Sequence, residues 1–189
     1  MSKTIRTFIA IEIPENIISK IQELQESIKA KGFNIRWVRP ENIHLTLKFI
    51  GDVEAAKISE ITEALSKTVE GYIPISLKSK GLGLFPGIKN PRVLWVGLTG
   101  QLESLVKLQK TLDENLKVLG FPKEKRPFKG HLTMGRIKAK IDAKKLGDAL
   151  MKFRNFESET FTADQIVLYK SELKPSGAVY TKLAGATFR

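Results

Sequence analysis

The chain of 189 residues contains no cysteine, which excludes disulfide bonds and thiolate metal sites. No apolar run approaches the roughly 18 residues that a membrane-spanning helix requires. The apolar stretch within residues 1–17 is too short for the apolar part of a secretion signal, and it soon becomes polar. We therefore expect a soluble, cytoplasmic protein that does not bind membranes.

Acidic residues are scarce relative to basic ones. The sequence has 32 Lys and Arg against 20 Asp and Glu, which gives a net charge of +12. A positive field of this size favours anionic partners, nucleic acid above all. A lysine-rich solvated surface has the same composition, so charge alone leaves both interpretations open.

Several common catalytic signatures are also missing. There is no GxxxxGK[ST] phosphate loop, no GxSxG nucleophile motif and no HExxH metal motif. Gly81-Leu82-Gly83 follows an extended run but lacks the third glycine and the helix of a dinucleotide site, so it is more typical of a turn. We expect no cofactor.

Hydrophobic periodicity predicts strands that alternate with helices. Strands are expected over 5–13, 35–38, 43–49, 73–84, 92–98, 156–161, 166–169 and 179–183. Helices are expected over 17–28, 58–69, 102–119 and 142–153, the last with Asp142 as its N-cap. Both halves of the chain run strand, helix, histidine strand, helix, strand. This order predicts a single α+β domain over 1–189 with two pseudo-equivalent lobes, from a first repeat of about 1–85 and a second of about 90–189.

The only two histidines lie in nearly identical settings. Residues 43–47 read IHLTL and residues 130–134 read GHLTM, which places His44 with Thr46 and His131 with Thr133. With ordinary residue frequencies, this agreement is a coincidence on the order of one in a million. A single histidine in a strand is more often structural, but the pair indicates a functional site.

The two-residue period of a strand places each histidine and threonine on one face, about 7 Å apart. Strict alternation adds Lys48 to the face of His44 and turns Phe49 toward the core. In the second copy it places Leu132 and Met134 in the core and Arg136 on the face opposite His131.

Two imidazoles and two hydroxyls around one phosphate suit phosphodiester cleavage by general acid and base. Because the unperturbed imidazole pKa is near 6.5, one ring can accept a proton while the other donates one. The threonine hydroxyls would hold the non-bridging oxygens. Zinc is the main rival, but threonine is a poor zinc ligand and neither histidine strand contains a carboxylate, so we expect no metal.

The sequence around these motifs resembles the RNA 2',3'-cyclic phosphodiesterases, also called 2'-5' RNA ligases, of the LigT/ThpR-like branch of the two-histidine phosphoesterases. The likeness rests on RTFIAI at 6–11, RWVRPENIHLTLKFIGD at 36–52, PRVLWVG at 91–97, RPFKGHLTMGRIK at 126–138 and SELKPSGAVYTKL at 171–183. It covers nearly the whole chain in order and departs at Gly130, where a proline is expected.

This resemblance implies two antiparallel sheets around a central cleft, with one motif in each lobe. It implies metal-free hydrolysis of a terminal 2',3'-cyclic phosphate to a 2'-phosphate, with His44 as the proton donor and His131 as the proton acceptor. Thr46 and Thr133 would bind phosphate. The near-symmetric motifs do not themselves set the order of acid and base. The family name also implies the reverse reaction, which joins RNA ends through a 2'-5' bond.

Other residues are candidates for contact with RNA. The cations nearest the histidine strands are Arg136, Lys48, Arg126, Lys129 and Arg39. Surface charge explains each of them equally well. Four aromatic side chains could stack on a base, although core packing is the commoner role for them: Phe8, Trp37, Trp95 and Tyr180.

We expect the partner to be RNA with 2',3'-cyclic phosphate ends, with tRNA as one candidate, and the protein to be a monomer. Two alternatives stay open. One is a module that binds RNA ends without turnover. The other is a related phosphoesterase that acts on ADP-ribose cyclic phosphate or a 2'-5' oligoadenylate.

Overall fold

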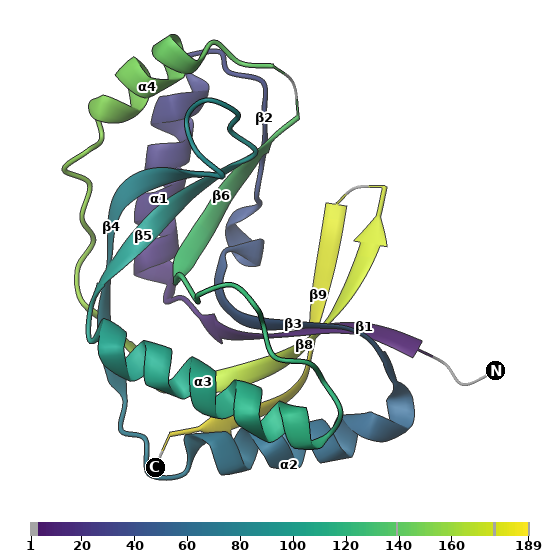
Figure 1. The fold of residues 1–189 in the computed structure, drawn as a ribbon. Coiled ribbons are helices and arrows are strands. Elements are labelled where there is room, and N and C mark those ends of the chain that lie inside the picture. The colour runs from purple at the N-terminus through teal and green to yellow at the C-terminus, as the bar shows by residue number, and fades with distance from the viewer. Residues whose placement is uncertain (1–3, 139, 176, 189) are drawn as a thin grey trace.

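The computed structural model describes residues 4–138, 140–175 and 177–188, and Figure 1 shows their arrangement. The strands are β1 Thr4–Glu12, β2 Ile35–Trp37, β3 His44–Glu54, β4 Ile75–Phe85, β5 Val93–Gly100, β6 His131–Ile137, β7 Phe161–Ala163, β8 Gln165–Lys174 and β9 Gly177–Thr187. The helices are α1 Glu15–Lys29, α2 Ile58–Val69, α3 Leu102–Val118 and α4 Ala143–Met151, with 3-10 turns at Pro40–Asn42 (η1) and Ala55–Lys57 (η2). Within these ranges, no helix has the length and apolar character needed to cross a membrane.

The fold is α+β and has two lobes, as expected (Figure 1). The strand order is β7-β4-β5-β6-β3-β1-β8-β9, with β2 paired to β6, and every pairing is antiparallel. The strands β3, β1, β8 and β9 form one half-sheet, and β7, β4, β5, β6 and β2 form the other. The halves join at a single residue pair, Leu45 with Leu132. The expected two sheets therefore meet as one curled sheet, and the joint lies beside both histidines.

Each lobe is built from segments that are distant in the sequence. The helices α2 and α3 pack beneath the β1–β3–β8–β9 half, whereas α1 lies behind β5 and β6 and α4 lies at the far end of that half (Figure 1). The helices bury apolar faces at helical spacing, for example Ile17, Ile21, Leu24 and Ile28 of α1. One hydrophobic cluster runs through both lobes. The chain thus crosses between lobes repeatedly, which holds the two histidine strands in a fixed relation.

Both histidine strands carry a β-bulge at the same place. In β3 the register against β1 shifts between Ile9 and Ala10, so that Leu47 has no partner. In β6 the register against β5 shifts between Leu94 and Trp95, so that Met134 has no partner. In each strand the extra residue is the third after the histidine. A bulge of this kind reverses which face the following side chains occupy.

Hydrogen bonds hold the bulge of β6 in place. The carbonyl of Met134 accepts from the backbone N–H of Val38 at 2.8 Å and from Nε2 of Gln25 at 2.9 Å. The Gln25 side chain is buried and also donates to the carbonyl of Val38. A carbonyl freed from the strand ladder would be costly to bury without such donors. The α1 glutamine therefore stabilises the irregular backbone next to the second motif.

Two expectations for the later part of the chain have different outcomes. The Asp142 cap is confirmed, because its carboxylate accepts from the backbone N–H groups of Lys144 and Lys145. The strand expected over 156–161 is wrong for most of its length: regular pairing begins only at Phe161, and Glu157 forms an isolated bridge to Lys80. The reason is an extra residue within 158–160: between the Leu77–Phe161 pair and the Lys80–Glu157 bridge the register against β4 shifts by one residue.

Candidate active site

The two histidines open their strands in the same way. His44 is the first residue of β3 and His131 is the first residue of β6. The Nδ1 of His44 lies 2.8 Å from the carbonyl oxygen of Asn42, and the Nδ1 of His131 lies 2.7 Å from the carbonyl oxygen of Lys129. A carbonyl can only accept, so each Nδ1 carries the hydrogen. Each neutral ring therefore presents a free lone pair at Nε2, which is ready to take a proton.

Burial lowers the pKa of both imidazoles. Loss of solvent is the main cause for His44, whose pKa falls to about 4, with a further lowering from the charge of His131. Loss of solvent is also the main cause for His131, and the charges of Lys129 and Arg136 add to the lowering of its pKa. The effect of His131 on the pKa of His44 shows that the two rings lie within electrostatic reach of each other. In the free protein both are neutral at pH 7.

The two threonines lie in one cavity. A cleft of about 480 Å³ contains Thr46 and Thr133 together with His44 and Arg136 in its lining. The register pairs His131 with Gly97 and Thr133 with Trp95, so His131 lies on the same face of the sheet as Thr133. The structure thus brings His44, Thr46 and Thr133 to one cleft, with His131 on the same face of its sheet as Thr133. This volume is in the range of small-ligand sites.

The placement expected for Lys48 is wrong, and the bulge at Leu47 is the reason. Lys48 turns away from the cleft and is 7% exposed. Its ammonium donates to Asp113 Oδ1 at 2.5 Å and to the carbonyl of Pro122 at 2.8 Å. Phe49, expected in the core, is instead 68% exposed and lines the cleft. Lys48 is therefore a buried structural cation and does not line the cleft.

The equivalent bulge at Met134 places Arg136 in the cleft. Strict alternation would put it on the face opposite His131, but the extra residue reverses the strand, and Arg136 lines the same cavity as Thr133. Phe49 and Arg136 occupy matching positions, five residues after their histidines. In both strands the two residues after the motif threonine are buried, Leu47-Lys48 and Met134-Gly135, but the lysine and the glycine do not indicate core positions in the sequence. Only the structure identifies these positions as bulges.

The remaining candidate cations lie at different distances from the cleft. Arg39 lines it, and two further arginines that the motifs did not single out, Arg6 and Arg36, line it as well. The ammonium of Lys129 lies 4.5 Å from the ring centre of Trp95, near His131. Arg126 lies in the exposed loop and pairs with Glu124 at 3.4 Å. Arg126 lines none of these cavities. The basic residues that line the cleft are arginines rather than lysines.

The four aromatic candidates lie at the site: three of them have rings near a histidine, and the fourth lines the cleft. Phe8 is 2% exposed, and its ring lies 4.8 Å from that of His44. Tyr180 contacts His44 edge to face at 5.4 Å and lines the cleft. Trp95 lies 6.1 Å from the ring of His131, and Trp37 is half-buried at the cleft wall. Each histidine is thus held between aromatic rings.

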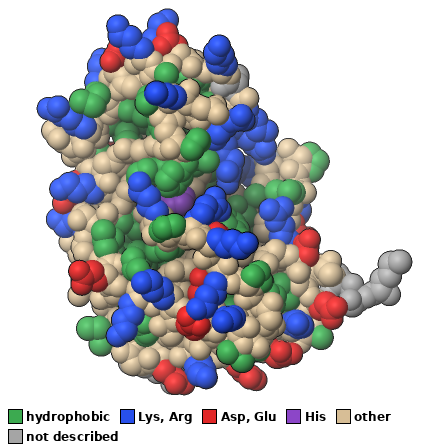
Figure 2. Space-filling model, in the orientation of Figure 1, with side chains coloured by type: hydrophobic (Ala, Val, Ile, Leu, Met, Phe, Trp, Pro, Cys, Tyr) green, Lys and Arg blue, Asp and Glu red, His purple; other side chains and the backbone are tan. Residues whose placement is uncertain are grey.

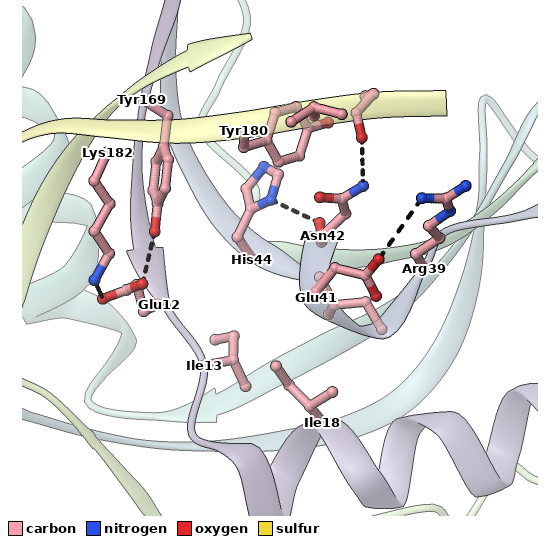
Figure 3. Close-up of a pocket in the computed structure, with 13 residues that line it drawn as sticks. Glu12, Ile13, Ile18, Arg39, Glu41, Asn42, His44, Tyr169, Tyr180 and Lys182 are labelled. Atoms are coloured by element: carbon pink, nitrogen blue, oxygen red, sulfur yellow. Dashed lines mark hydrogen bonds and ion pairs between the residues drawn. The ribbon is translucent and has the colours of Figure 1, made fainter. Parts of the chain in front are cut away.

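A second cavity of about 350 Å³ lies beside His44 (Figure 3). Its far wall is a network around Glu12, which accepts from Tyr169 at 2.7 Å and from Lys182 at 2.7 Å. Burial and the Glu12 carboxylate raise the pKa of Tyr169 well above its usual value, so its hydroxyl stays protonated and donating. Asn42 ties η1 to β9 through the carbonyl of Ala178 at 2.9 Å. The sequence motifs gave no sign of this network.

Positive charge surrounds the site. Figure 2 shows a histidine at the centre of one face, with lysine, arginine and hydrophobic side chains around it. Acidic side chains on this face lie mainly toward its edges. Across the described ranges, no three His, Asp or Glu side chains gather in a way that could hold a metal ion. The chemistry that the residues themselves support is proton transfer at a bound anion.

Comparison with known proteins identifies the family. The profile of LigT-like phosphoesterases matches residues 11–95 and again residues 96–180, which together span most of the chain. The chain belongs to the LigT-like phosphoesterase family. Each match contains one of the two histidine motifs.

Two relatives of this LigT-like phosphoesterase match nearly its whole length. The RNA 2',3'-cyclic phosphodiesterase of Methanocaldococcus jannaschii is 42% identical over 175 residues, which cover 93% of this chain and 96% of the relative. The protein of the same description from Thermotoga maritima is 37% identical and covers 97% and 95%.

Solved structures have the same architecture. The protein TT0787 of Thermus thermophilus has a TM-score of 0.81 at 26% identity and covers 97% of this chain and 98% of its own. The crystal structure of Escherichia coli LigT complexed with 3'-AMP has a TM-score of 0.75 at 23% identity, covering 98% and 99%. At that identity the LigT comparison shows the fold alone, and it agrees with the two-lobed arrangement around a cleft.

Proposed function

We propose that this LigT-like phosphoesterase hydrolyses the 2',3'-cyclic phosphodiester at an RNA end to a 2'-phosphomonoester by metal-independent acid–base catalysis. The observation that carries the proposal is the matched pair of imidazoles, each with Nδ1 bonded to a backbone carbonyl, beside a cleft that holds both motif threonines. The relatives described as RNA 2',3'-cyclic phosphodiesterases, at 42% and 37% identity, support this substrate class.

In the proposed reaction, the Nε2 of His131 removes a proton from water, which attacks phosphorus. The Nε2 of His44 donates a proton to the departing 3' oxygen, and the P–O3' bond breaks. Thr46 and Thr133 donate hydrogen bonds to the non-bridging oxygens as charge accumulates on them. Arg136 lies in the same cleft and would stabilise that charge. The 2' oxygen keeps its bond to phosphorus.

Substrate binding raises the pKa of His44, so that the imidazole takes up a proton from solvent. With a pKa of about 4 in the free protein, His44 is neutral at pH 7. A cyclic phosphate brings one negative charge to the cleft, and an opposite charge within about 4–6 Å raises an imidazole pKa. The charged acid therefore forms together with the complex. Its Nε2–H then points toward the anion while Nδ1 keeps its bond to Asn42.

The cations of the cleft would track the RNA backbone. Arg6, Arg36 and Arg39 lie along the cavity beyond the catalytic residues and suit phosphates of preceding nucleotides. Lys129 and Arg126 remain candidates for outlying contacts. Transfer RNA is among the candidate substrates, and we propose that the protein acts as a monomer in the cytoplasm without a metal ion.

Product analysis tests the proposal. A short RNA that ends in a 2',3'-cyclic phosphate is incubated with the protein and EDTA, and the phosphorus NMR spectrum is followed. We expect conversion to a 2'-phosphate. A 3'-phosphate product would contradict the placement of His44 beside the 3' oxygen. Binding of the RNA without any conversion would favour the RNA-end module instead.

The roles of the two histidines can be separated by a leaving-group substitution. A cyclic substrate with sulfur in place of the 3' oxygen needs little protonation as the bond breaks. We expect this substrate to restore much of the rate of His44→Ala but not that of His131→Ala. The opposite pattern would reverse the assignment. Parallel reactions with ADP-ribose cyclic phosphate and a 2'-5' oligoadenylate test the alternative substrates.

A further inference from the structure

Glu12 is the register partner of the proposed proton donor. The ladder of β1 against β3 pairs Glu12, the last residue of β1, directly with His44, the first residue of β3. Side chains of directly opposed residues lie on one face of a sheet, with Cβ atoms about 4.5–5.5 Å apart. Both side chains line the cavity of about 350 Å³ described above (Figure 3). A carboxylate therefore shares this cavity with the imidazole that the proposed reaction uses as its acid.

This carboxylate is ionised and is taken up by other partners. The Tyr169 hydroxyl donates to Oε1 of Glu12 at 2.7 Å, and the Lys182 ammonium donates to Oε2 at 2.7 Å. The Gln165 amide also donates to Oε2, at 3.2 Å. Burial alone would raise the pKa of Glu12, but the hydrogen bonds from Lys182 and Tyr169 outweigh it and lower that pKa. The negative charge is thus present at neutral pH, and three donors from β8 and β9 hold it.

The sheet fixes the direction of the tyrosine. Tyr169 of β8 is the register partner of Lys182 on one side and of Phe8 on the other. Its ring stacks on Phe8 at 5.3 Å, and Phe8 in turn packs against the ring of His44 at 4.8 Å. Figure 3 shows Tyr169 and Lys182 on the same side of His44 as Glu12. The hydroxyl and the ammonium therefore reach the carboxylate from a rigid part of the sheet.

A carboxylate without these partners would change the behaviour of the imidazole. An opposite charge within about 4–6 Å favours the protonated ring and raises its pKa. The pKa of His44 is nevertheless lowered to about 4, with loss of solvent as the main cause. The cavity leaves room for the Glu12 side chain to turn toward the ring. The three donors keep the carboxylate from that position.

The remaining charges near His44 are mainly positive. Besides the network just described, the charged and titratable side chains that line the cleft and the cavity are Arg6, Arg36, Arg39, Glu41, Arg136 and Tyr180. Glu41 pairs with Arg39 at 3.9 Å, and burial raises the pKa of Tyr180, which stays neutral. The charge of His131 further lowers the pKa of His44. Both carboxylates of the cavity are thus matched with cations, and the imidazole is left to respond to a bound anion.

We propose that Tyr169 and Lys182 are positioning residues of the acid–base reaction, which hold and neutralise the Glu12 carboxylate so that it does not act on His44. The imidazole then takes up its proton in response to the phosphate of the substrate, as the proposed reaction requires. Without the two donors, Glu12 would take the place of that phosphate and favour a charged ring in the free protein. This inference rests on the role proposed above for His44 as the proton donor.

Imidazole NMR of the free protein tests the inference without any substrate. Tyr169→Phe removes one hydroxyl and keeps the stacked ring, whereas Lys182→Met removes the ammonium and keeps most of the side-chain length. We expect each change to raise the pKa of His44 by about half a unit or more, as one charge at this distance requires near a surface. Lys170→Met is the matched control, because Lys170 also lies in this part of the sheet and pairs with Glu172 at 3.0 Å. It should leave the pKa of His44 unchanged.

A double variant separates the effect of Glu12 from a direct effect of the lysine. Loss of the Lys182 charge would by itself favour a protonated His44. When Glu12→Gln is added to Lys182→Met, both charges are absent, and we expect the pKa of His44 to return to the wild-type value. A rise that persists in the double variant would overturn the inference. An unchanged pKa in both Tyr169→Phe and Lys182→Met would also overturn it, since the network would then only stabilise the sheet.

The pH dependence of hydrolysis gives a second readout. The alkaline limb of kcat reports the proton donor in the complex. We expect Tyr169→Phe and Lys182→Met to move this limb to higher pH, and Glu12→Gln with Lys182→Met to leave it in place. A limb that stays in place in both single variants would contradict the positioning role. Shifts of the His44 pKa in a protein whose wild type does not hydrolyse the RNA end would contradict the proposed function and still support the hold on Glu12.

Discussion

At the scale of single residues, the tautomers of the two histidines decide the chemistry. Each Nδ1–H is held by a carbonyl two residues earlier in the chain, which leaves Nε2 for the substrate. Burial lowers both pKa values, so both imidazoles are neutral in the free protein. They acquire positive charge only when an anion is present.

Imidazole NMR checks this prediction without assignment ambiguity, because the chain has only two histidines. In the free protein we expect both rings to titrate below 6.5, with His44 near 4. Addition of a 2'-phosphate-terminated RNA should move both pKa values upward. The depressed pKa also means that the unfolded chain takes up the proton first, so folding weakens as pH falls from about 6.5 toward 4. A ring that titrates at or above 6.5 in the free protein would contradict this account.

Lys48 provides a second test at the residue scale. It lies in the first motif strand, but its ammonium is buried with Asp113 on the other face. Lys48→Met would leave the Asp113 carboxylate buried without its partner, and we expect a loss of about 3–5 kcal/mol in the free energy of unfolding. The kcat of the folded protein should change less than about threefold, since Lys48 does not line the cleft.

Denaturant unfolding and kinetics on the same preparation measure both effects. Lys123→Met is the matched control, because Lys123 pairs with Glu114 at the surface, where such a pair contributes under about 1 kcal/mol. A Lys48→Met protein that is as stable as the wild type but loses RNA binding would show that the lysine belongs to the site after all.

At the scale of the element, the duplicated bulge determines which side chains reach the substrate. The extra residues Leu47 and Met134 turn Phe49 and Arg136 into the cleft. Gly135 follows the second bulge, and a Cβ there would lie 2.5 Å from Cγ2 of Ile35 in β2. The contact of β2 with β6 therefore requires glycine at this position.

Gly135→Ala should destabilise the protein by about 1–3 kcal/mol, because the added methyl group forces β2 away from β6. It should also lower kcat/KM, since Arg136 is the next residue in the chain and Thr133 lies two residues before the altered one. Gly147→Ala is the matched control: it lies inside α4, its Cβ would meet only Ile88 at 3.8 Å, and helix propensity should stabilise it by up to about 1 kcal/mol. Thermal unfolding of both variants measures the two changes in stability, which should have opposite signs. Equal stabilities of the two variants would contradict the packing argument.

The same elements show what sequence could predict. The histidines and threonines were found because strands have a fixed two-residue period and the motif occurs twice. Lys48, Phe49 and Arg136 were placed on the wrong faces because a bulge adds one residue without any fixed sequence signature. The strand expected over 156–161 was wrong for a similar reason, since an extra residue within 158–160 shifts its register against β4. The Glu12 network joins residues from both ends of the chain, which no local pattern reveals.

At the scale of the whole molecule, the net charge of +12 should favour a polynucleotide over a small cyclic phosphate. Arg6, Arg36, Arg39 and Arg136 line the cleft, so we expect a longer RNA to meet more cations than a mononucleotide does. For single strands, each phosphate contact contributes about −0.7 to the slope of log affinity against log salt.

Between 50 and 200 mM salt, we expect the KM of a ten-nucleotide RNA with a cyclic end to rise roughly 10–50-fold, as three or four phosphate contacts require. The KM of a nucleoside 2',3'-cyclic phosphate should rise only about 2–3-fold. Steady-state kinetics at several salt concentrations gives both values. Equal salt dependence for the two substrates would indicate that the protein contacts the terminal nucleotide alone.

The most direct test of the central claim compares RNA-end hydrolysis by the wild type, His44→Ala, His131→Ala and the double variant in the presence of EDTA. The account predicts full activity of the wild type and a loss of roughly 10²–10⁴-fold in each single variant. Because the two histidines act as a unit, the double variant should be scarcely worse than either single one. A wild type inactivated by EDTA, or a single variant that retains more than a tenth of the rate, would contradict metal-free catalysis by the histidine pair.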